Sequence, residues 1–240
     1  MNAPFSNDLP VNVYSASSQT GARIAVLADG RYIVTWASDG QDGSGYGIFA
    51  QAYSAAGQRI GTSFQVNATA INAQTEPEIA ATSDGGFVIL WQSNLQDGSG
   101  YGVYAQRFDA DAAPVGDQIH VSTLTQYDQF QPDVIGLPSG GFAVVWSDHA
   151  ADSGYYYDSD IRLQLFAADD TPAATEATVN TVTAGTQSEP QIALIAASAE
   201  ANQLAAGGFV VTWTDNSASA DHADRSGYRV LAQRYALDGT

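Results

Sequence analysis

Acidic side chains alternate with glycine in two segments, which is the pattern that a calcium site requires. The first segment holds Asp39 and Asp42, and the second holds Asn94 and Asp97 at the same offset of 55 residues. Ca²⁺ prefers six to eight oxygen ligands on a tightly turning chain. These four residues are therefore expected metal ligands.

A third acidic segment supplies further candidate calcium ligands, namely Asp148, Asp152, Asp158 and Asp160. The first two segments lack a closing acid, because Gly47 and Gly102 stand where one would be needed. The alternative is that aspartate and glycine serve only the turns, where both are common. The sequence leaves both interpretations open, and calcium is the one cofactor it suggests.

Catalytic constellations are scarce in this sequence. It has no cysteine, no serine, histidine and aspartate in a nucleophile elbow, and no glycine-rich phosphate loop before a helix. Paired carboxylates for glycoside hydrolysis stay open, since acids occur along the whole chain. None of these acids has a distinctive sequence environment, so we expect no catalytic residues and no enzyme activity.

The elements that must position these segments follow from a fourfold repeat. Four apolar runs end in tryptophan, at Trp36, Trp91, Trp146 and Trp213. Turn signals such as Asp84-Gly85-Gly86 divide each repeat of about 55 residues into four strands. Four-stranded units that cannot bury their apolar faces alone are typical of propeller blades. We predict an all-β protein with one domain, residues 1–240, that forms a β-propeller of four four-stranded blades.

The phase of the repeat predicts how the ring closes. Residues 6–14 match the fourth strand of a repeat, and the chain stops at Thr240 after a third strand. The N-terminal strand would then complete the last blade within one chain and give a monomer. The alternative is that two chains, or a longer parent protein, share an eight-bladed ring.

Two kinds of residue recur at fixed positions of the repeats. Glutamine occurs before the first strand, as at Gln74, and inside the third strand, as at Gln106. We expect it to hydrogen-bond loop backbone between blades, because an amide both donates and accepts. We expect the tryptophans in the core, although a tryptophan beside a polar loop can also stack on a sugar.

The charge excludes several partners. The chain has 26 acidic and 8 basic side chains, for a net charge of −18. Nucleic acid and anionic membrane surfaces would be repelled. No apolar run approaches the roughly 18 residues of a membrane-spanning helix, so we expect no membrane insertion. The N-terminus shows no signal peptide, so a secreted protein would use another route or belong to a larger protein.

The repeats resemble tracts in large bacterial secreted calcium-binding proteins of the RTX-adhesin kind. The resemblance rests on Gly85–Trp91, Asp97–Phe108, Val179–Thr181 and Gln187–Pro190. The acidic loops also loosely resemble FG-GAP propeller loops. The resemblance implies a non-catalytic, extracellular binding or adhesion module stabilised by calcium, with a carbohydrate or protein ligand. The alternatives are a lectin-like, carbohydrate-binding propeller and a polysaccharide-acting enzyme.

Overall fold

The computed structural model describes residues 10–149, 158–197, 207–217 and 227–240. The described residues form strands and turns without a helix, as predicted. Within the described segments, no helix is long and apolar enough to span a membrane.

The strands form four antiparallel sheets, one for each repeat, each built by consecutive strands. The first sheet contains β1 (Gln19–Val26), β2 (Tyr32–Asp39), β3 (Tyr46–Tyr53) and β4 (Arg59–Gln65). The second contains β5 (Gln74–Ala81), β6 (Phe87–Asn94), β7 (Tyr101–Phe108) and β8 (Pro114–His120). The third contains β9 (Gln129–Gly136), β10 (Phe142–His149), β11 (Ser159–Phe166) and the short β12 (Ala177–Thr178). The fourth contains β13 (Gln187–Ile195), β14 (Gly208–Asp215) and β15 (Arg229–Tyr235).

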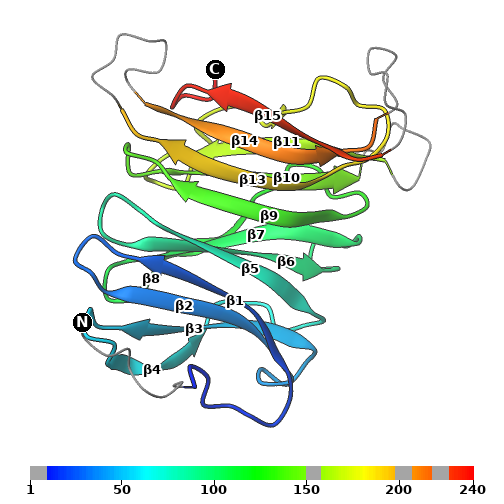
Figure 1. Ribbon diagram of the computed structural model, residues 1–240. Helices are drawn as coiled ribbons and strands as arrows, with labels where there is room; N and C mark the ends of the chain where they lie inside the picture. The colour runs from blue at the N-terminus through cyan, green and yellow to red at the C-terminus, as the bar shows by residue number, and fades with distance from the viewer. Residues whose placement is uncertain (1–9, 150–157, 198–206, 218–226) are drawn as a thin grey trace.

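The sheets stack face to face, and the hydrophobic core lies between them (Figure 1). One apolar cluster joins the first sheet to the second, another the second to the third, and another the third to the fourth. The second strands of the two middle sheets, β6 and β10, are buried on both faces because each packs against two neighbouring sheets, whereas β2 and β14 belong to the end sheets and have one neighbour. All four tryptophans are buried, which confirms their predicted place in the core.

Pairs of glycines form the tight turns between the first and second strands of the second and third sheets. Gly85 and Gly140 have positive φ angles of 92° and 91°, which glycine adopts without strain. A Cβ atom on the following Gly86 would lie 2.3 Å from the carbonyl oxygen of Phe108. The Gly-Gly pair therefore serves both the turn and the close packing of the third strand.

Glutamines at the start of the first strands link successive sheets, as predicted, whereas those inside the third strands, such as Gln106, donate to backbone carbonyl oxygens of their own sheet. In the link between the first and second sheets, Asn67 Oδ1 accepts from the Ile48 backbone N–H at 2.7 Å, and Asn67 Nδ2 donates to Gln74 Oε1 at 2.9 Å. Asn180 makes the same pair of bonds to Ile161 and Gln187 between the third and fourth sheets. The amide pair thus ties the third strands of the first and third sheets to the sheet that follows each.

The predicted closure of the ring within one chain is not what the described residues show. The fourth sheet has three strands there, and β15 pairs with β14 alone. Residues 6–9 of the expected closing strand lie outside the described residues, and residues 10–14 form no strand. The first and fourth sheets lie at opposite ends of the stack (Figure 1). Propeller-like sheets are therefore confirmed, whereas a closed four-bladed ring is not.

Candidate functional site

The first strands of all four sheets border one cavity of about 580 Å³. We call it the inner-strand cavity. Strands β1, β5, β9 and β13 lie side by side in this order (Figure 1). Its lining residues are Thr20, Gly21, Arg23, Tyr46, Thr75, Glu76, Glu78, Gln131, Pro132, Glu189, Pro190 and Gln191. The repeat thus brings together equivalent residues that are far apart in the sequence.

Each of these first strands contains a β-bulge at the same place. The strand register shifts there, and the third residue has a positive φ angle in every repeat. In the first repeat this residue is Gly21; in the others it is Glu76, Gln131 and Glu189, with φ of 51°, 53° and 54°. Left-handed backbone costs a residue with a side chain roughly 1–2 kcal/mol. Such strain in three repeats, all at one cavity, is typical of a functional site.

Glu78 is the most perturbed acid in this cavity. Its side chain is 17% exposed, and Oε1 accepts from Arg23 Nε on the neighbouring sheet at 2.6 Å. Burial raises the pKa of Glu78 to about 7, against the lowering effect of Arg23, and the charges of Asp133 and Glu76 raise it further. Near neutral pH, a substantial share of Glu78 therefore carries a proton.

Three more acids lie around the same centre. Burial raises the pKa of Glu76, against the lowering effects of the Gln131 backbone N–H and the Arg23 charge. Burial also raises the pKa of Asp133, although its two oxygens accept from the backbone N–H groups of Val134 and Ile192 at 2.9 and 2.8 Å. Glu189 comes from the fourth sheet, and its Oε2 accepts from Thr214 Oγ1 at 3.2 Å.

This arrangement can perform acid–base chemistry on a polar ligand. A carboxylic acid that titrates near neutrality can donate a proton, while a second carboxylate accepts one or attacks. Two carboxyl groups flanking one bond are the catalytic requirement of most glycoside hydrolases. Our expectation that no acid has a distinctive environment is therefore wrong for Glu76, Glu78 and Asp133.

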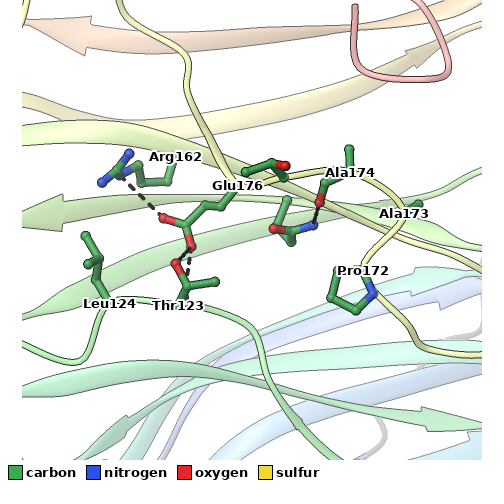
Figure 2. Close-up of a pocket in the computed structure, with 9 residues that line it drawn as sticks. Thr123, Leu124, Arg162, Pro172, Ala173, Ala174 and Glu176 are labelled. Carbon is green, nitrogen blue, oxygen red and sulfur yellow. Dashed lines mark hydrogen bonds and ion pairs between the residues drawn. The ribbon is translucent and has the colours of Figure 1, made fainter.

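A second cleft, of about 620 Å³, lies on the third sheet beside β11, and we call it the outer cleft (Figure 2). Glu176 Oε2 accepts from the backbone N–H and Oγ1 of Thr123 at 2.8 and 2.6 Å. Its Oε1 lies 3.6 Å from Arg162 Nε. The opposite wall is formed by Pro172, Ala173 and Ala174. The carboxylate of this cleft is thus fully engaged by the protein itself.

The predicted calcium ligands are spread over separate hairpins. Asp39 Oδ2 accepts from Ser17, and Asp42 and Asp97 each accept a backbone N–H two residues onward, at Ser44 and Ser99. Asn94 ends β6 and hydrogen-bonds Ala73 through its backbone. Within the described residues, no three His, Asp or Glu side chains are grouped to hold a metal ion. Calcium binding at these loops stays a prediction.

The third acidic segment is divided by the structure. Asp148 is buried and accepts from Gln129 Nε2 and Arg162 Nε, both at 3.1 Å. Asp160 Oδ1 accepts from Asn180 Nδ2 at 2.6 Å. Asp158 immediately precedes β11, and Asp152 lies outside the described residues. Asp148 and Asp160 therefore already have protein donors.

Sequence reasoning missed the inner-strand acids, although a signal was present. The chain contains five glutamates, and three of them are Glu76, Glu78 and Glu189. Two of these, Glu76 and Glu189, stand in the Gln-x-Glu-Pro form of the repeated motif that begins the first strand, and Glu78 lies two residues after Glu76. A scarce residue type concentrated near the start of the first strands was the clue. Its meaning required knowing that first strands meet around one cavity.

Comparisons with known proteins identify relatives of the fold. No family model matches the sequence, and no curated protein matches it. An N-acetylgalactosamine deacetylase from F. plautii, solved with blood group B trisaccharide, superposes with a TM-score of 0.58 at 13% identity, over 98% of this chain and 78% of that one. A thermostable family-43 glycoside hydrolase gives 0.51 at 11% identity, over 89% and 70%. The α-L-arabinanase of Penicillium chrysogenum, solved with arabinobiose, gives 0.53 at 12% identity, over 91% and 57%.

These neighbours correct two expectations. The predicted kinship with RTX-adhesin tracts is wrong, because the solved structures that share the fold include glycoside hydrolases. The expectation of a non-catalytic module is corrected as well, since the fold is shared with carbohydrate-acting enzymes and the inner-strand cavity carries a carboxylate cluster. At these identities the likeness concerns the fold alone.

Proposed function

We propose that this protein is a carbohydrate-acting enzyme, a glycoside hydrolase whose active site is the inner-strand cavity. The observation that carries the proposal is the acid cluster on three adjacent first strands, with Glu78 titrating near neutrality. Support comes from neighbours of the same fold that are named for action on arabinan or N-acetylgalactosamine. Each sheet then serves as one propeller blade, and the first strand of each blade presents its bulge to the substrate.

The roles follow from environment and position. Glu78 is the general acid, because burial keeps its proton available near neutral pH. Glu189 is the general base or nucleophile, since it lines the same cavity from the fourth sheet, two sheets away from Glu78. Gln131 lies on the intervening sheet and supplies an amide for sugar hydroxyls. Arg23 orients Glu78 through the 2.6 Å ion pair.

The polymer class suggests where the protein works. Polysaccharides are met mainly outside the cell, which agrees with the secreted location expected from the acidic, cysteine-free sequence. The acidic surface favours neutral or cationic glycans over polyanions, because like charge repels.

A second candidate function is carbohydrate binding without turnover. It is favoured by the Arg23–Glu78 ion pair, which occupies one oxygen of the proposed acid. In this alternative the bulged strands form a lectin-like site, and the carboxylates accept sugar hydroxyls.

One experiment separates the two candidates. The purified protein is incubated with arabinan, xylan and N-acetylgalactosamine-containing glycans, and reducing-end release and calorimetric binding are both measured. We expect turnover of one polymer class and a loss of about 10²–10⁴-fold in kcat in Glu78→Gln, as for removal of a general acid. Glu176→Gln, from the outer cleft, is the matched control and should keep full activity. Saturable binding without turnover would support the lectin-like function, and neither binding nor turnover would contradict both.

A further inference from the structure

The two ends of the stack expose faces that are buried everywhere else in the molecule. On the first sheet, Ile24 and Val26 pair with Val34 and Tyr32 in β2, so all four side chains share one face. We call it the front face. Ile24 is 60% exposed there, whereas Ile192, at the equivalent position of the fourth sheet, is buried against the preceding sheet. The front face thus lacks the sheet that would precede it.

The fourth sheet exposes the opposite face, carried by Val210, Thr212, Val230, Ala232 and Arg234. We call it the back face. Val230 pairs with Thr214, and Arg234 pairs with Val210. Val230 is 76% exposed, whereas its equivalents Ile48, Val103 and Ile161 are completely buried by the following sheet. The back face thus lacks the sheet that would follow it.

Arg234 indicates what the back face is built to meet. The equivalent residue of the second sheet is Arg107, in the same Ala-Gln-Arg-aromatic sequence. Arg107 is buried and donates across the sheet interface to the carbonyl oxygens of Ala168 and Gly140 and to Asp170. On the first sheet, Ala55 and Gly30 are equivalent to Ala168 and Gly140 and would offer the same two carbonyl oxygens. Gly57 is equivalent to Asp170.

Asn12 supplies an independent observation. Its Nδ2 donates to Tyr14 O at 2.7 Å and to Gln19 Oε1 at 2.9 Å, as Asn67 donates to Thr69 O and Gln74 Oε1. Asn67 Oδ1 also accepts from Ile48, on the third strand of the preceding sheet. Among the described residues, Asn12 Oδ1 has no such donor. The equivalent donor is the Val230 backbone N–H, on the free edge of β15.

We propose that a second copy of this chain docks its front face on the back face of the first copy. Asn12 of the second copy would accept from the Val230 backbone N–H, and Arg234 would donate to the Ala55 and Gly30 carbonyl oxygens. A cavity of about 260 Å³ at the front face, lined in part by Val11, Val34 and Trp36, would receive apolar side chains of the back face. The contact continues the three sheet interfaces already present in the chain.

The same contact within one chain is excluded by the arrangement of the sheets. The first and fourth sheets lie at opposite ends of the stack, so the front face cannot reach the back face of its own copy (Figure 1). A head-to-tail contact forms a closed ring when the rotation per unit completes a circle. Propellers typically have four to eight blades, so two copies of four sheets give a ring at the upper end of this range.

The test is the solution mass of the full chain by light scattering after size exclusion, over a wide range of concentrations. We expect a dimer for the wild type and loss of that dimer in Val230→Glu and in Ile24→Glu, with unchanged circular dichroism. Ile71→Glu is the matched control, because Ile71 is 70% exposed but lies in the loop between β4 and β5. It should remain dimeric.

Mixing the two disrupted variants tests the head-to-tail geometry. Val230→Glu keeps an intact front face, and Ile24→Glu keeps an intact back face, so an equimolar mixture should regain a heterodimer. A symmetric contact of like faces would instead leave one of the two variants fully dimeric. A wild-type monomer at all concentrations, or a dimer that neither substitution affects, would overturn the proposal.

Discussion

The inner-strand cavity and the outer cleft have similar volumes and each places a glutamate near an arginine, yet their electrostatics differ. In the outer cleft, Glu176 accepts two hydrogen bonds from Thr123 and lies near Arg162. In the inner-strand cavity, Arg23 forms an ion pair with Glu78 and its charge also acts on Glu76 and Asp133, while the negative charges of those two acids work against ionisation of Glu78. The outer cleft is electrostatically satisfied, whereas the inner-strand cavity keeps an excess of negative charge.

The difference teaches how to separate structural acids from functional ones in a chain with many acids. A carboxylate that is saturated by fixed donors gains stability and has little capacity left for a ligand. A buried group of carboxylates that share one arginine costs stability and keeps protons near neutral pH. Such a cluster persists where it serves a function, as perturbed titration often indicates.

The largest expected effect concerns the pH dependence of the proposed activity. Because the pKa of Glu78 is raised to about 7, the general acid loses its proton above that pH. The rate should therefore fall about tenfold for each pH unit well above 7. The measurement is kcat between pH 5 and 9 on the polymer found by the screen. An alkaline limb that stays flat to pH 9 would assign the proton donor to another group.

The same pKa shift predicts a change of stability with pH. Folded Glu78 binds its proton more tightly than the unfolded chain does, so its favourable contribution is fully present below about pH 4.5 and is lost as pH rises through about 7. The unfolding free energy of Glu78→Gln relative to wild type should therefore increase over this window. Urea denaturation at pH 4.5 and 8 measures it, and Glu176→Gln serves as the control.

Substitution of Glu176 in the outer cleft should lower the stability of the protein and leave its activity unchanged. Glu176→Ala leaves the Thr123 N–H and hydroxyl without their acceptor and removes a carboxylate near Arg162. Because Thr123 is exposed and water can replace the lost acceptor, the cost is about 0.5–1.5 kcal/mol. Denaturant unfolding measures this cost, and kcat should stay within twofold of wild type. Loss of activity without loss of stability would mean that the outer cleft binds substrate, which would reverse the comparison.

The sequence predicted the all-β sheets because they depend on local, repeated signals, whereas the predicted closure of the ring was not confirmed. The hairpin at Asp84-Gly85-Gly86 and the two-faced apolar strand at Phe87–Trp91 each need few residues to be read. The cavity could not be predicted in the same way, because Glu78 and Glu189 belong to different sheets. Their closeness depends on which strand of each repeat lies innermost. The pKa of Glu78 depends further on burial, which no spacing reveals.

A smaller effect tests the strain in the inner strands. Glu76 has a φ angle of 51°, while the first repeat places Gly21 at this position. Glu76→Gly should stabilise the protein by about 0.5–1 kcal/mol, because relief of left-handed strain outweighs the added chain entropy. Ala80→Gly in the same strand, where the φ angle is ordinary, should instead destabilise it by a similar amount. Equal destabilisation by both, measured by urea unfolding, would show that residue 76 is unstrained.

The smallest expected effect is that of calcium on the acidic hairpins. Asp42 Oδ2 and Asp97 Oδ2 are buried without a hydrogen-bond partner among the described residues, as are Gln41 Oε1 and Gln96 Oε1 beside them. These oxygens suit a hard cation, but Asp97 Oδ2 also lies 3.5 Å from His120 Nε2, which competes with the cation when the histidine is protonated. A weak site would stabilise the fold by about 0.4 kcal/mol when free calcium equals its dissociation constant.

The test for calcium compares thermal unfolding at pH 8 in millimolar calcium, in magnesium and in chelator. A calcium-specific shift that Asp42→Asn and Asp97→Asn remove together would make the hairpins a second set of functional acids. Identical unfolding in all three buffers would leave them as turns, and the inner-strand cavity would then hold the functional acids by itself.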